Sequence, residues 1–293
     1  MYYMLSLLTG ILISVMVAFN GGLTEQYDIY SATVIIHIVG LMLISAVVLI
    51  KRERLFAKRY AWFLYLGGAI GVMTTIFNNF SFGRISVSAI LALGLFGQSV
   101  AGLIIDQYGF FGMPKHPFTR QKLIGLLLII AGIGSMINSF EIVAITLSFA
   151  AGVNIVLSRT FNAKLSAVTS VRVSTFYNYI VGLVISIPVF LILGRNEMVL
   201  TEFAFSPSWH IYLGGVLGVC VVLISNITVV KISAFYLTLL IFIGQVFSGI
   251  LIDVIISQEL SPRILIGGVL VAVGLSVNLL LDNKKRQAKG CLS

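Results

Sequence analysis

Charge is scarce in this sequence. Only 10% of the 293 residues are Asp, Glu, Lys or Arg, whereas hydrophobic residues make up 59%. A soluble domain normally carries about 25% charged residues, because its surface has to face water. Charges this few cannot cover a water-facing surface, so we expect the chain to use a lipid bilayer as its solvent.

Short alternating segments of the kind that build transmembrane barrels are also missing. Only α-helices and closed β-barrels satisfy every backbone polar group in lipid. Barrel strands alternate apolar and polar residues over about ten positions. This chain instead has long unbroken apolar runs, which predict an all-α membrane protein.

The usual marks of an enzyme or a cofactor site are absent as well. The two cysteines, Cys220 and Cys291, give neither a disulfide framework nor a metal-ligand spacing. No glycine-rich loop with a following lysine is present to hold a nucleotide phosphate, so ATP is not the expected energy source. We therefore expect no enzyme, no cofactor and no bound metal. Nucleic acid is not an expected partner either, because the net charge of +9 comes from Lys and Arg lying between apolar runs.

Ten apolar runs free of Asp, Glu, Lys and Arg predict ten transmembrane helices. A span needs about 20 such residues. The runs cover residues 1–24, 29–50, 60–83, 85–105, 123–140, 142–158, 173–194, 203–230, 232–252 and 264–281. The sixth run is short, because it stops before Arg159, which this pattern places in the following loop.

Basic residues are distributed very unequally between the two sides that these spans define. Three of the 19, Arg84, Arg195 and Arg263, fall on one side, and the other sixteen fall on the side of the termini. Loops rich in Lys and Arg stay in the cytoplasm. We predict a multi-pass protein of the plasma membrane with both termini in the cytoplasm.

The chain also repeats itself. Asn20 and Gly40 recur 142 positions later as Asn162 and Gly182, and Trp62 recurs 147 positions later as Trp209. We predict two five-helix repeats, residues 1–140 and 141–293. Because five is odd, the second repeat enters the membrane from the opposite face and the repeats are inverted.

Inverted repeats are typical of secondary transporters, whose substrate sites lie near the membrane midplane where the repeats meet. We therefore expect a transporter, a monomer or homodimer, that exports a small organic molecule by alternating access. The alternative is a duplication kept for packing alone, in a non-transporting membrane scaffold or partner subunit.

One stretch recurs in the fourth span of each half. It reads Gly97-Gln98…Gly102…Asp106 and Gly244-Gln245…Gly249…Asp253. With ten spans, this pattern resembles the YdcZ-like branch of the drug/metabolite transporter superfamily. The resemblance implies an exporter in which spans one, three and four of each half line a central cavity and spans five and ten lie at the periphery. Small multidrug exporters of the superfamily carry a glutamate in the first span, whereas the run over residues 1–24 has no carboxylate.

Uncharged polar side chains inside the spans are the candidate substrate ligands, because polar groups in a membrane are costly and often functional. Gln98 and Gln245 lie near the middle of their spans, where they could bind substrate or join helices to one another. The other candidates are Asn20, Asn162, Asn79, Asn226 and Tyr236. Each asparagine could equally cap a helix end, and the tyrosine could simply lie at the membrane interface.

Three titratable groups are candidates for coupling or gating. Asp106 and Asp253 end the fourth and ninth spans, where they could gate the path, carry protons or pair with a nearby basic residue. His37 lies within the second span and could titrate near neutrality or be a hydrogen-bonded structural residue. Proton coupling through these groups is an expectation of the transporter hypothesis.

Overall fold

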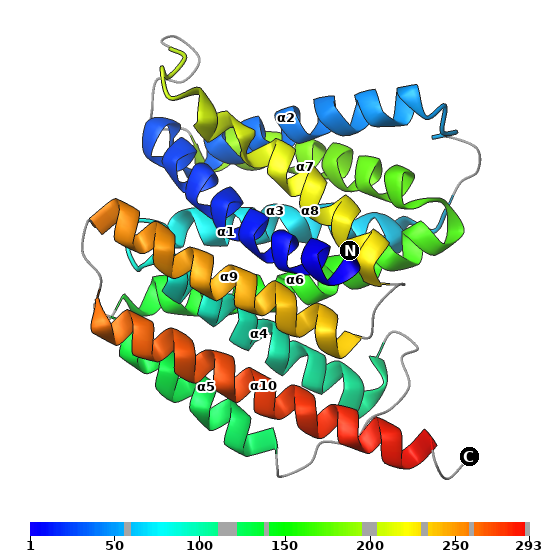
Figure 1. Cartoon of the computed structure of the whole chain (residues 1–293). Helices are drawn as coiled ribbons and strands as arrows, with labels where there is room; N and C mark the ends of the chain where they lie inside the picture. Colours follow the sequence, from blue (N-terminus) through cyan, green and yellow to red (C-terminus); the bar gives the residue numbers. More distant parts are fainter. Residues whose placement is uncertain are drawn as a thin grey trace.

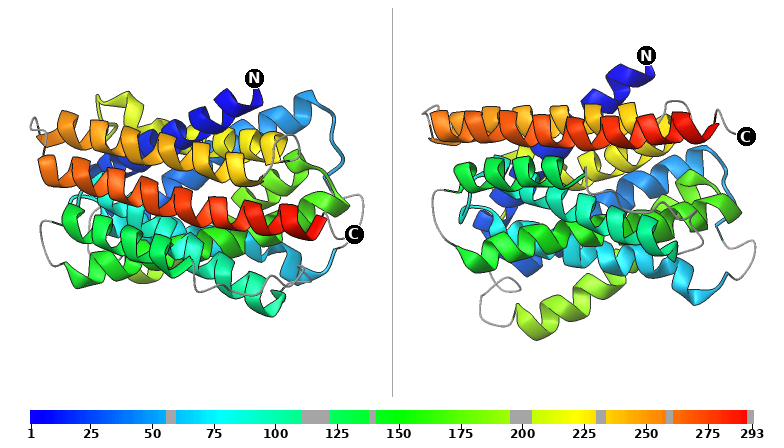
Figure 2. Two further views of the ribbon diagram at one scale, coloured as in Figure 1. Left: turned by 60° about the horizontal axis from the view of Figure 1, so that its bottom comes forward. Right: turned by 90° about the horizontal axis from the view of Figure 1, so that it is seen from below.

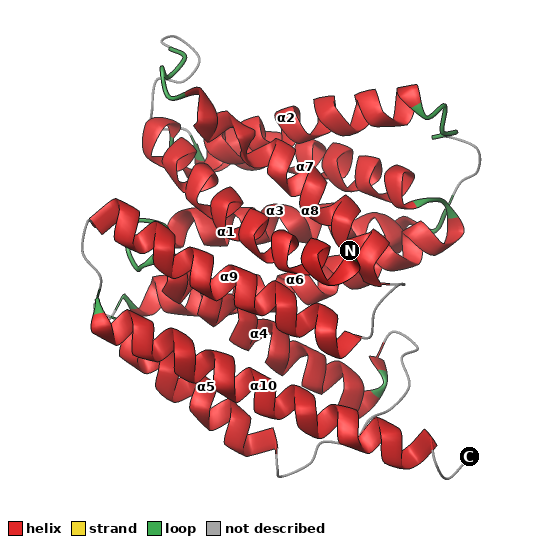
Figure 3. Cartoon of the chain, in the orientation of Figure 1, coloured by secondary structure: helices red, strands yellow, loops and turns green. Residues whose placement is uncertain are grey.

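The computed structural model describes residues 1–55, 60–110, 122–137, 141–194, 204–229, 234–257 and 261–290. Over these ranges the chain is almost entirely helical and has no strand beyond one isolated bridge between Phe82 and Ile85 (Figures 1 and 3). The helices are α1 Tyr2–Tyr27, α2 Ile29–Ile50, α3 Leu66–Ser81, α4 Val87–Tyr108, α5 Lys122–Met136, α6 Ile142–Val168, α7 Val171–Leu193, α8 Gly214–Val229, α9 Ala234–Ser257 and α10 Pro262–Gly290. Two 3-10 turns, η1 Trp62–Tyr65 and η3 Trp209–Leu213, lead into α3 and α8.

Polar side chains fix where several helices begin. Asp28 accepts hydrogen bonds from the backbone N–H groups of Tyr30 and Ser31 at the start of α2, at 2.6 and 3.1 Å. Ser86 caps α4 and Ser170 caps α7 through single bonds from backbone N–H groups three residues later. These caps satisfy donors that the first turn of a helix leaves free. The short turns between long apolar helices are therefore encoded locally.

Six helices in the described part of the chain, namely α1, α2, α4, α6, α7 and η1 with α3, are long and apolar enough to cross a membrane. The other four, α5, α8, α9 and α10, contain shorter apolar stretches. The all-helical, apolar fold expected from the sequence is therefore confirmed.

The expected end of the sixth apolar run is wrong as a helix boundary. Helix α6 has 27 residues and continues through Arg159 and Lys164 to Val168. Arg159 thus lies inside a helix and not in a loop. Backbone hydrogen bonds and the packing of α6 against α3 and α4 outweigh the local preference of two charged side chains for water.

Helices pack mainly against helices from the other half of the chain. Helix α1 packs against α8 and α9, and α6 packs in the same way against α3 and α4. Helices α2 and α7, α4 and α9, and α5 and α10 pair with each other (Figures 1 and 2). The same pattern of contacts results if each helix is replaced by its counterpart in the other half, so that α6 takes the place of α1 and α1 that of α6. The halves are therefore interlocked and share one interior.

The two ends of the bundle differ in which parts of the chain they carry. Both chain termini lie towards one end, which we call the terminal end (Figures 1 and 2). The turn between α3 and α4 lies at the opposite end, which we call the Gly83 end. Helices α4 and α6 run from the Gly83 end towards the terminal end, and α9 runs the other way.

Glycines let the helices of the two halves approach backbone to backbone. A β-carbon on Gly10 of α1 would collide with the carbonyl oxygen of Ile241 in α9. A β-carbon on Gly152 of α6 would collide in the same way with the carbonyl oxygen of Gly94 in α4. Small residues are the usual means of close helix packing where no water drives association. These two contacts occupy equivalent positions in the two halves.

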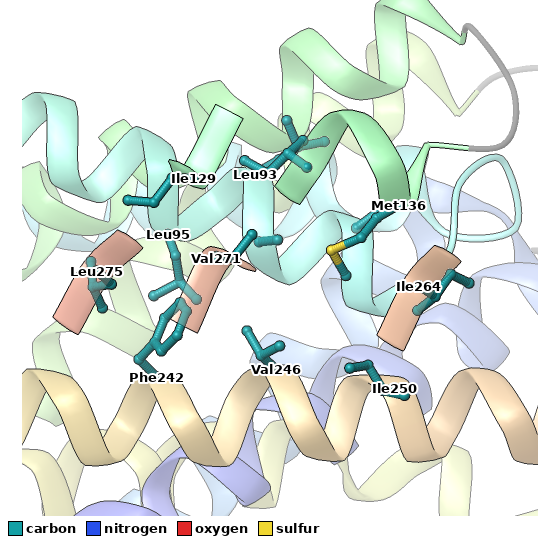
Figure 4. Packing of buried hydrophobic residues seen from close by; sticks show 13 residues of the cluster. Leu93, Leu95, Ile129, Met136, Phe242, Val246, Ile250, Ile264, Val271 and Leu275 are labelled. Atoms are coloured by element: carbon teal, nitrogen blue, oxygen red, sulfur yellow. The ribbon is translucent and has the colours of Figure 1, made fainter. Parts of the chain in front are cut away.

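The largest apolar cluster holds α4, α5, α9 and α10 together (Figure 4). Phe242 and Val246 of α9 are fully buried against Ile129 of α5 and Val271 of α10. Helices α5 and α10 lie at the edge of the bundle, away from α2 and α7. This cluster anchors α4 and α9 on their outer side, so that their other faces turn towards α6 and α1.

The α5–α10 contact gives a matched pair of tests. A β-carbon on Gly132 would lie 2.6 Å from the carbonyl oxygen of Gly267, whereas one on Gly134 would meet nothing within 4 Å. We predict that Gly132→Leu destabilises the protein by about 1–3 kcal/mol or more through overpacking, whereas Gly134→Leu changes little. Thermal unfolding of the purified protein in detergent, followed by size-exclusion chromatography, measures the difference. Equal melting temperatures for the two variants would contradict the packing.

Candidate functional site in the centre of the bundle

The contact between α2 and α7 is built around two equivalent rings. His37 and Tyr179 occupy the same position in the two halves, and their ring centroids are 5.9 Å apart. The His37 Nδ1–H donates to the Thr33 carbonyl at 2.7 Å, and the Tyr179 hydroxyl donates to the Gly215 carbonyl at 3.3 Å. The His37 ring lies on Gly182, where a β-carbon would collide with it. His37 is thus packed and hydrogen-bonded, and its coupling role stays a prediction.

A polar cluster joins α6 and α7 of the second half to α3 of the first half. The Asn162 side-chain amide donates to Asn178 Oδ1 at 2.8 Å and to Ser158 Oγ at 3.4 Å. Ser158 in turn donates to the carbonyl of Gly67 at 2.7 Å. The Ser174 hydroxyl donates to the Asn162 carbonyl at 2.8 Å. Asn162, one of the expected site residues, therefore organises three helices.

Asn20, the counterpart of Asn162 in the first half, has a different environment. The Asn20 side chain lies against Gly214, as Asn162 lies against Gly67. The positions equivalent to Ser158 and Asn178 are Met16 and Ile36, which cannot hydrogen-bond the amide. Asn20 is 8% exposed, and its Oδ1 has no partner among the described residues. The repeat is therefore symmetrical in backbone packing but not in polarity.

Gln98 and Gln245 lie on the helices that face the centre. The Gln98 backbone N lies close to Gly152 of α6, and the Gln245 backbone carbonyl accepts a 2.8 Å hydrogen bond from Ser14 of α1. The Gln98 side chain is half-buried. Gln245 is 4% exposed, and its Oε1 has no partner in the described part of the chain. The two glutamines thus differ in access although their positions are equivalent.

Asn79 lies at the Gly83 end, away from these residues. It is buried, its Nδ2 has no partner among the described residues, and it lines a cavity of about 540 Å³. The Arg84 guanidinium at this cavity also covers the ring of Phe80, 3.7 Å from its centroid. Asp28 and Thr24 form part of the same wall. Asn79 therefore lies in the wall of this cavity, and its role as a substrate ligand stays a prediction.

Asp253 binds the start of α4. Its carboxylate accepts hydrogen bonds from the backbone N–H groups of Val87 at 2.6 Å and Ser88 at 3.0 Å. A carboxylate is stabilised there by free N–H groups and by the helix dipole. Asp253 therefore ties the end of α9 to the beginning of α4 at the Gly83 end. The side chains of its counterpart Asp106 and of Asn226 and Tyr236 lie outside what the structure describes.

The contact between α4 and α9 is tight at the Gly83 end. A β-carbon on Gly249 of α9 would lie 2.9 Å from Leu91 Cδ1 and 3.1 Å from Ser88 Cα of α4. Val17, Val87 and Ile90 fill the neighbouring space with apolar side chains. The side chains of Phe235 and Thr238, the counterparts of Ser88 and Leu91 for the equivalent Gly102, lie outside what the structure describes. The bundle is thus packed shut near Gly249.

Three polar residues of α6 and α7 are not among the sites that the sequence predicts, namely Asn178 and Ser158 of the polar cluster and the exposed Arg159. Asn178 and Ser158 have no polar counterpart in the first half, so a search for repeated residues passes over them. The rule that a charge ends an apolar run places Arg159 in a loop. These residues can be found in the sequence as positions where the two halves differ within spans that otherwise match.

An apolar, all-helical bundle with interlocked halves and polar groups at its centre is the kind of fold that membrane transporters have. A family model described as "Putative inner membrane exporter, YdcZ" matches residues 1–134 and again residues 143–277. The chain therefore belongs to the YdcZ family of the drug/metabolite transporter superfamily, and the two matches are consistent with a two-repeat form.

A solved structure described as "Crystal structure of protein" aligns with a TM-score of 0.67 and 14% identity, over 95% of this chain and 98% of that one. At this identity the likeness shows a shared fold. No curated protein matches the sequence.

The polar cluster predicts unequal effects of equivalent substitutions. Asn162→Leu removes two hydrogen bonds and leaves Asn178 without its donor, at a cost of about 1–2 kcal/mol. Asn20→Leu removes no hydrogen bond in the described structure and should cost much less. Melting temperatures in one detergent measure both. A larger loss for Asn20→Leu would contradict the assigned asymmetry.

Proposed function

We propose that the protein is a secondary transporter that exports a small organic solute by alternating access. In this proposal ten spans form two inverted repeats, residues 1–140 and 141–293, with the terminal end in the cytoplasm. The basic residues on the side of the termini support this orientation. Family membership supports export.

The observation that carries the proposal is the equivalent packing of helices across the two halves. Helix α1 packs against α8 and α9 as α6 packs against α3 and α4, and α4 pairs with α9. Repeats interlocked in this way can exchange conformations, so that a contact closed at one end of the α4–α9 pair opens while its counterpart closes at the other end. The tight contact at Gly249 is the closed contact in this scheme.

The exchange also defines the gates. In the present state α9 closes on α4 at the Gly83 end, where Asp253 binds Val87 and Ser88. In the other state α4 would close on α9 at the terminal end, with Gly102 against Phe235 and Thr238, the counterparts of Ser88 and Leu91. Asp106 would then bind the start of α9. The contact at the Gly83 end is thus the closed gate of the present state.

Between the gates lies the proposed substrate site. Gln98 is half-buried on α4 beside α6, and Asn162 holds the wall of α3, α6 and α7 in place. Asn79 would receive the solute at the other mouth. A cavity that faces each side in turn needs polar groups along its whole length, and these residues supply them.

The second candidate, a non-transporting membrane scaffold, needs no open interior. Sparse charge and glycine packing suit a scaffold equally well. Family membership favours transport, because the matching family is described as a putative exporter.

Disulfide cross-linking tests the exchange. We predict that Ser88→Cys with Gly249→Cys forms a disulfide under mild oxidation, because the built β-carbon of Gly249 lies 3.1 Å from Ser88 Cα. The matched pair, Gly102→Cys with Phe235→Cys, should form one only when the protein visits the opposite state. Both would be measured in a background without Cys220 and Cys291, by mobility after proteolysis between the halves.

In proteoliposomes screened with a pool of labelled metabolites, either disulfide should stop efflux, and a reductant should restore it. If the second cysteine pair never cross-links in membranes, alternating access is contradicted. Unchanged flux through the protein after oxidation of the first pair would contradict it as well.

A further inference from the structure

The chain reverses direction at the end of α2. The backbone N–H of Arg52 donates to the Leu49 carbonyl and that of Glu53 donates to the Val48 carbonyl, both at 3.1 Å. Together these bonds form a Schellman motif, in which the residue after the cap takes a left-handed conformation and is usually glycine. Here that residue is Arg52, with φ 51°. The backbone therefore disfavours arginine at this position, and the side chain needs a reason of its own.

Residues 51–55, which we call the basic turn, carry their positive charges on the outside. Lys51, Arg52 and Arg54 are exposed, whereas Glu53 and Leu55 are half-buried. Glu53 is the one carboxylate of the turn. The outer side of the basic turn therefore has three cationic side chains and no acidic one.

The two half-buried residues hold the basic turn against the start of α7. Arg172 Nε donates to Glu53 Oε1 at 2.6 Å, and the Tyr177 hydroxyl donates to the Leu55 carbonyl at 2.7 Å. The Tyr177 ring also meets the ring of Tyr65 in η1, with the centroids 4.9 Å apart. The basic turn and η1 are therefore fixed to the same residue of α7.

Trp62 begins η1 and is 75% exposed. It precedes Tyr65 by three residues, which is one turn of a 3-10 helix or about 6 Å. Trp62 is thus only one short turn from the contact between Tyr65 and Tyr177 that also fixes the basic turn. Exposed tryptophans of membrane proteins gather at the level of the lipid headgroups, because the indole is apolar and its N–H is polar.

An equivalent arrangement lies at the Gly83 end. The Tyr27 hydroxyl donates to the Ala204 carbonyl at 2.8 Å, and the Tyr27 ring meets that of Tyr212, the counterpart of Tyr65, at a centroid distance of 6.1 Å. Trp209 begins η3 and is 70% exposed. Each half of the chain therefore presents one exposed tryptophan beside a pair of tyrosines.

The two arrangements are about one bilayer apart. Helix α2 begins two residues after Tyr27 and ends directly before the basic turn (Figure 1). Its 22 residues span about 33 Å at 1.5 Å per residue, and the hydrocarbon core of a bilayer is about 30 Å thick. Trp62 and Trp209 are therefore at the right separation to lie at the two opposite interfaces.

The positive charges distinguish the two ends of α2 and α7. The counterparts of Lys51 and Arg52, 142 positions later, are Leu193 and Gly194. Gly194 follows the last residue of α7 as Lys51 follows that of α2. The end of α2 therefore has a cationic surface that the repeat does not require.

We propose that the basic turn and Trp62 form a surface that binds anionic phospholipid headgroups at the terminal end. Basic residues directly outside a transmembrane helix attract anionic lipids. A guanidinium offers a planar pair of donors that matches phosphate oxygens, and the Trp62 indole would lie just below the headgroups. Because the partner is a plane of lipids, the charges do not have to converge in a pocket. This surface is independent of transport.

Tryptophan fluorescence tests the proposal directly, because the chain has two tryptophans. Trp209→Phe leaves Trp62 as the reporter, and Trp62→Phe leaves Trp209 as the matched control. Each variant would be placed in nanodiscs with equal parts of phosphatidylcholine and phosphatidylglycerol, with either one lipid or the other brominated near its headgroup. We expect brominated phosphatidylglycerol to quench Trp62 more than brominated phosphatidylcholine does, and the two lipids to quench Trp209 about equally. Equal quenching of Trp62 by both lipids, or quenching by neither, overturns the proposal.

Removal of the charges tests whether the basic turn causes the preference. Each cationic side chain near a membrane surface changes the local preference for anionic lipid about fivefold. In the Trp209→Phe protein, Lys51→Gln, Arg52→Gly and Arg54→Gln together should bring the quenching ratio close to that of Trp209. The charge-conserving set Lys51→Arg, Arg52→Lys and Arg54→Lys should keep the preference. A preference that survives the first set, or is lost in the second, overturns the proposal.

Arg52→Gly alone separates lipid binding from folding. Glycine adopts the left-handed conformation of position 52 without strain, so this variant should melt in detergent at a temperature no lower than the parent protein. In nanodiscs it should nevertheless lose about fivefold of the preference of Trp62 for phosphatidylglycerol. An unchanged preference in this variant would show that Arg52 does not face the lipid headgroups and would remove it from the surface.

Discussion

Backbone contact between helices of opposite halves is the constraint on which the rest of the structure depends. Gly10 admits the backbone of α9, and Gly152 admits the backbone of α4. In lipid there is little hydrophobic force between helices, so this close approach supplies much of the attraction. It also interlocks the halves, because each first helix lies against two helices of the other repeat. Neither half can move without changing its contacts with the other.

The contact between α4 and α9 lies within this interlocked frame. Gly249 and Asp253 hold the end of α9 against the start of α4. Their counterparts Gly102 and Asp106 lie at the equivalent positions of α4, so the sequence carries the same residues for a contact with the start of α9. Under the proposed alternating access, the two contacts would form in turn.

The sequence predicts most of the fold because the bilayer restricts it to helices and the repeat supplies the pairing. Gly10, Asn20 and Trp62 are visible as repeated residues, and the helices that carry them pack in equivalent ways. The site is harder to predict. Asn162 gains its importance from Asn178 and Ser158, which belong to no repeated pattern. The continuation of α6 through Arg159 escapes prediction, because a charge that ends an apolar run does not have to end a helix.

Symmetry and its violation therefore carry different information in this chain. Positions that match between halves, such as Gly10 and Gly152, make equivalent backbone contacts and hold the halves together. Positions that differ, such as Asn178 against Ile36, cannot make equivalent contacts. Asn178 instead gives the second half a hydrogen bond with Asn162 that the first half lacks. The two halves can therefore share one backbone arrangement and still present different side chains to the interior.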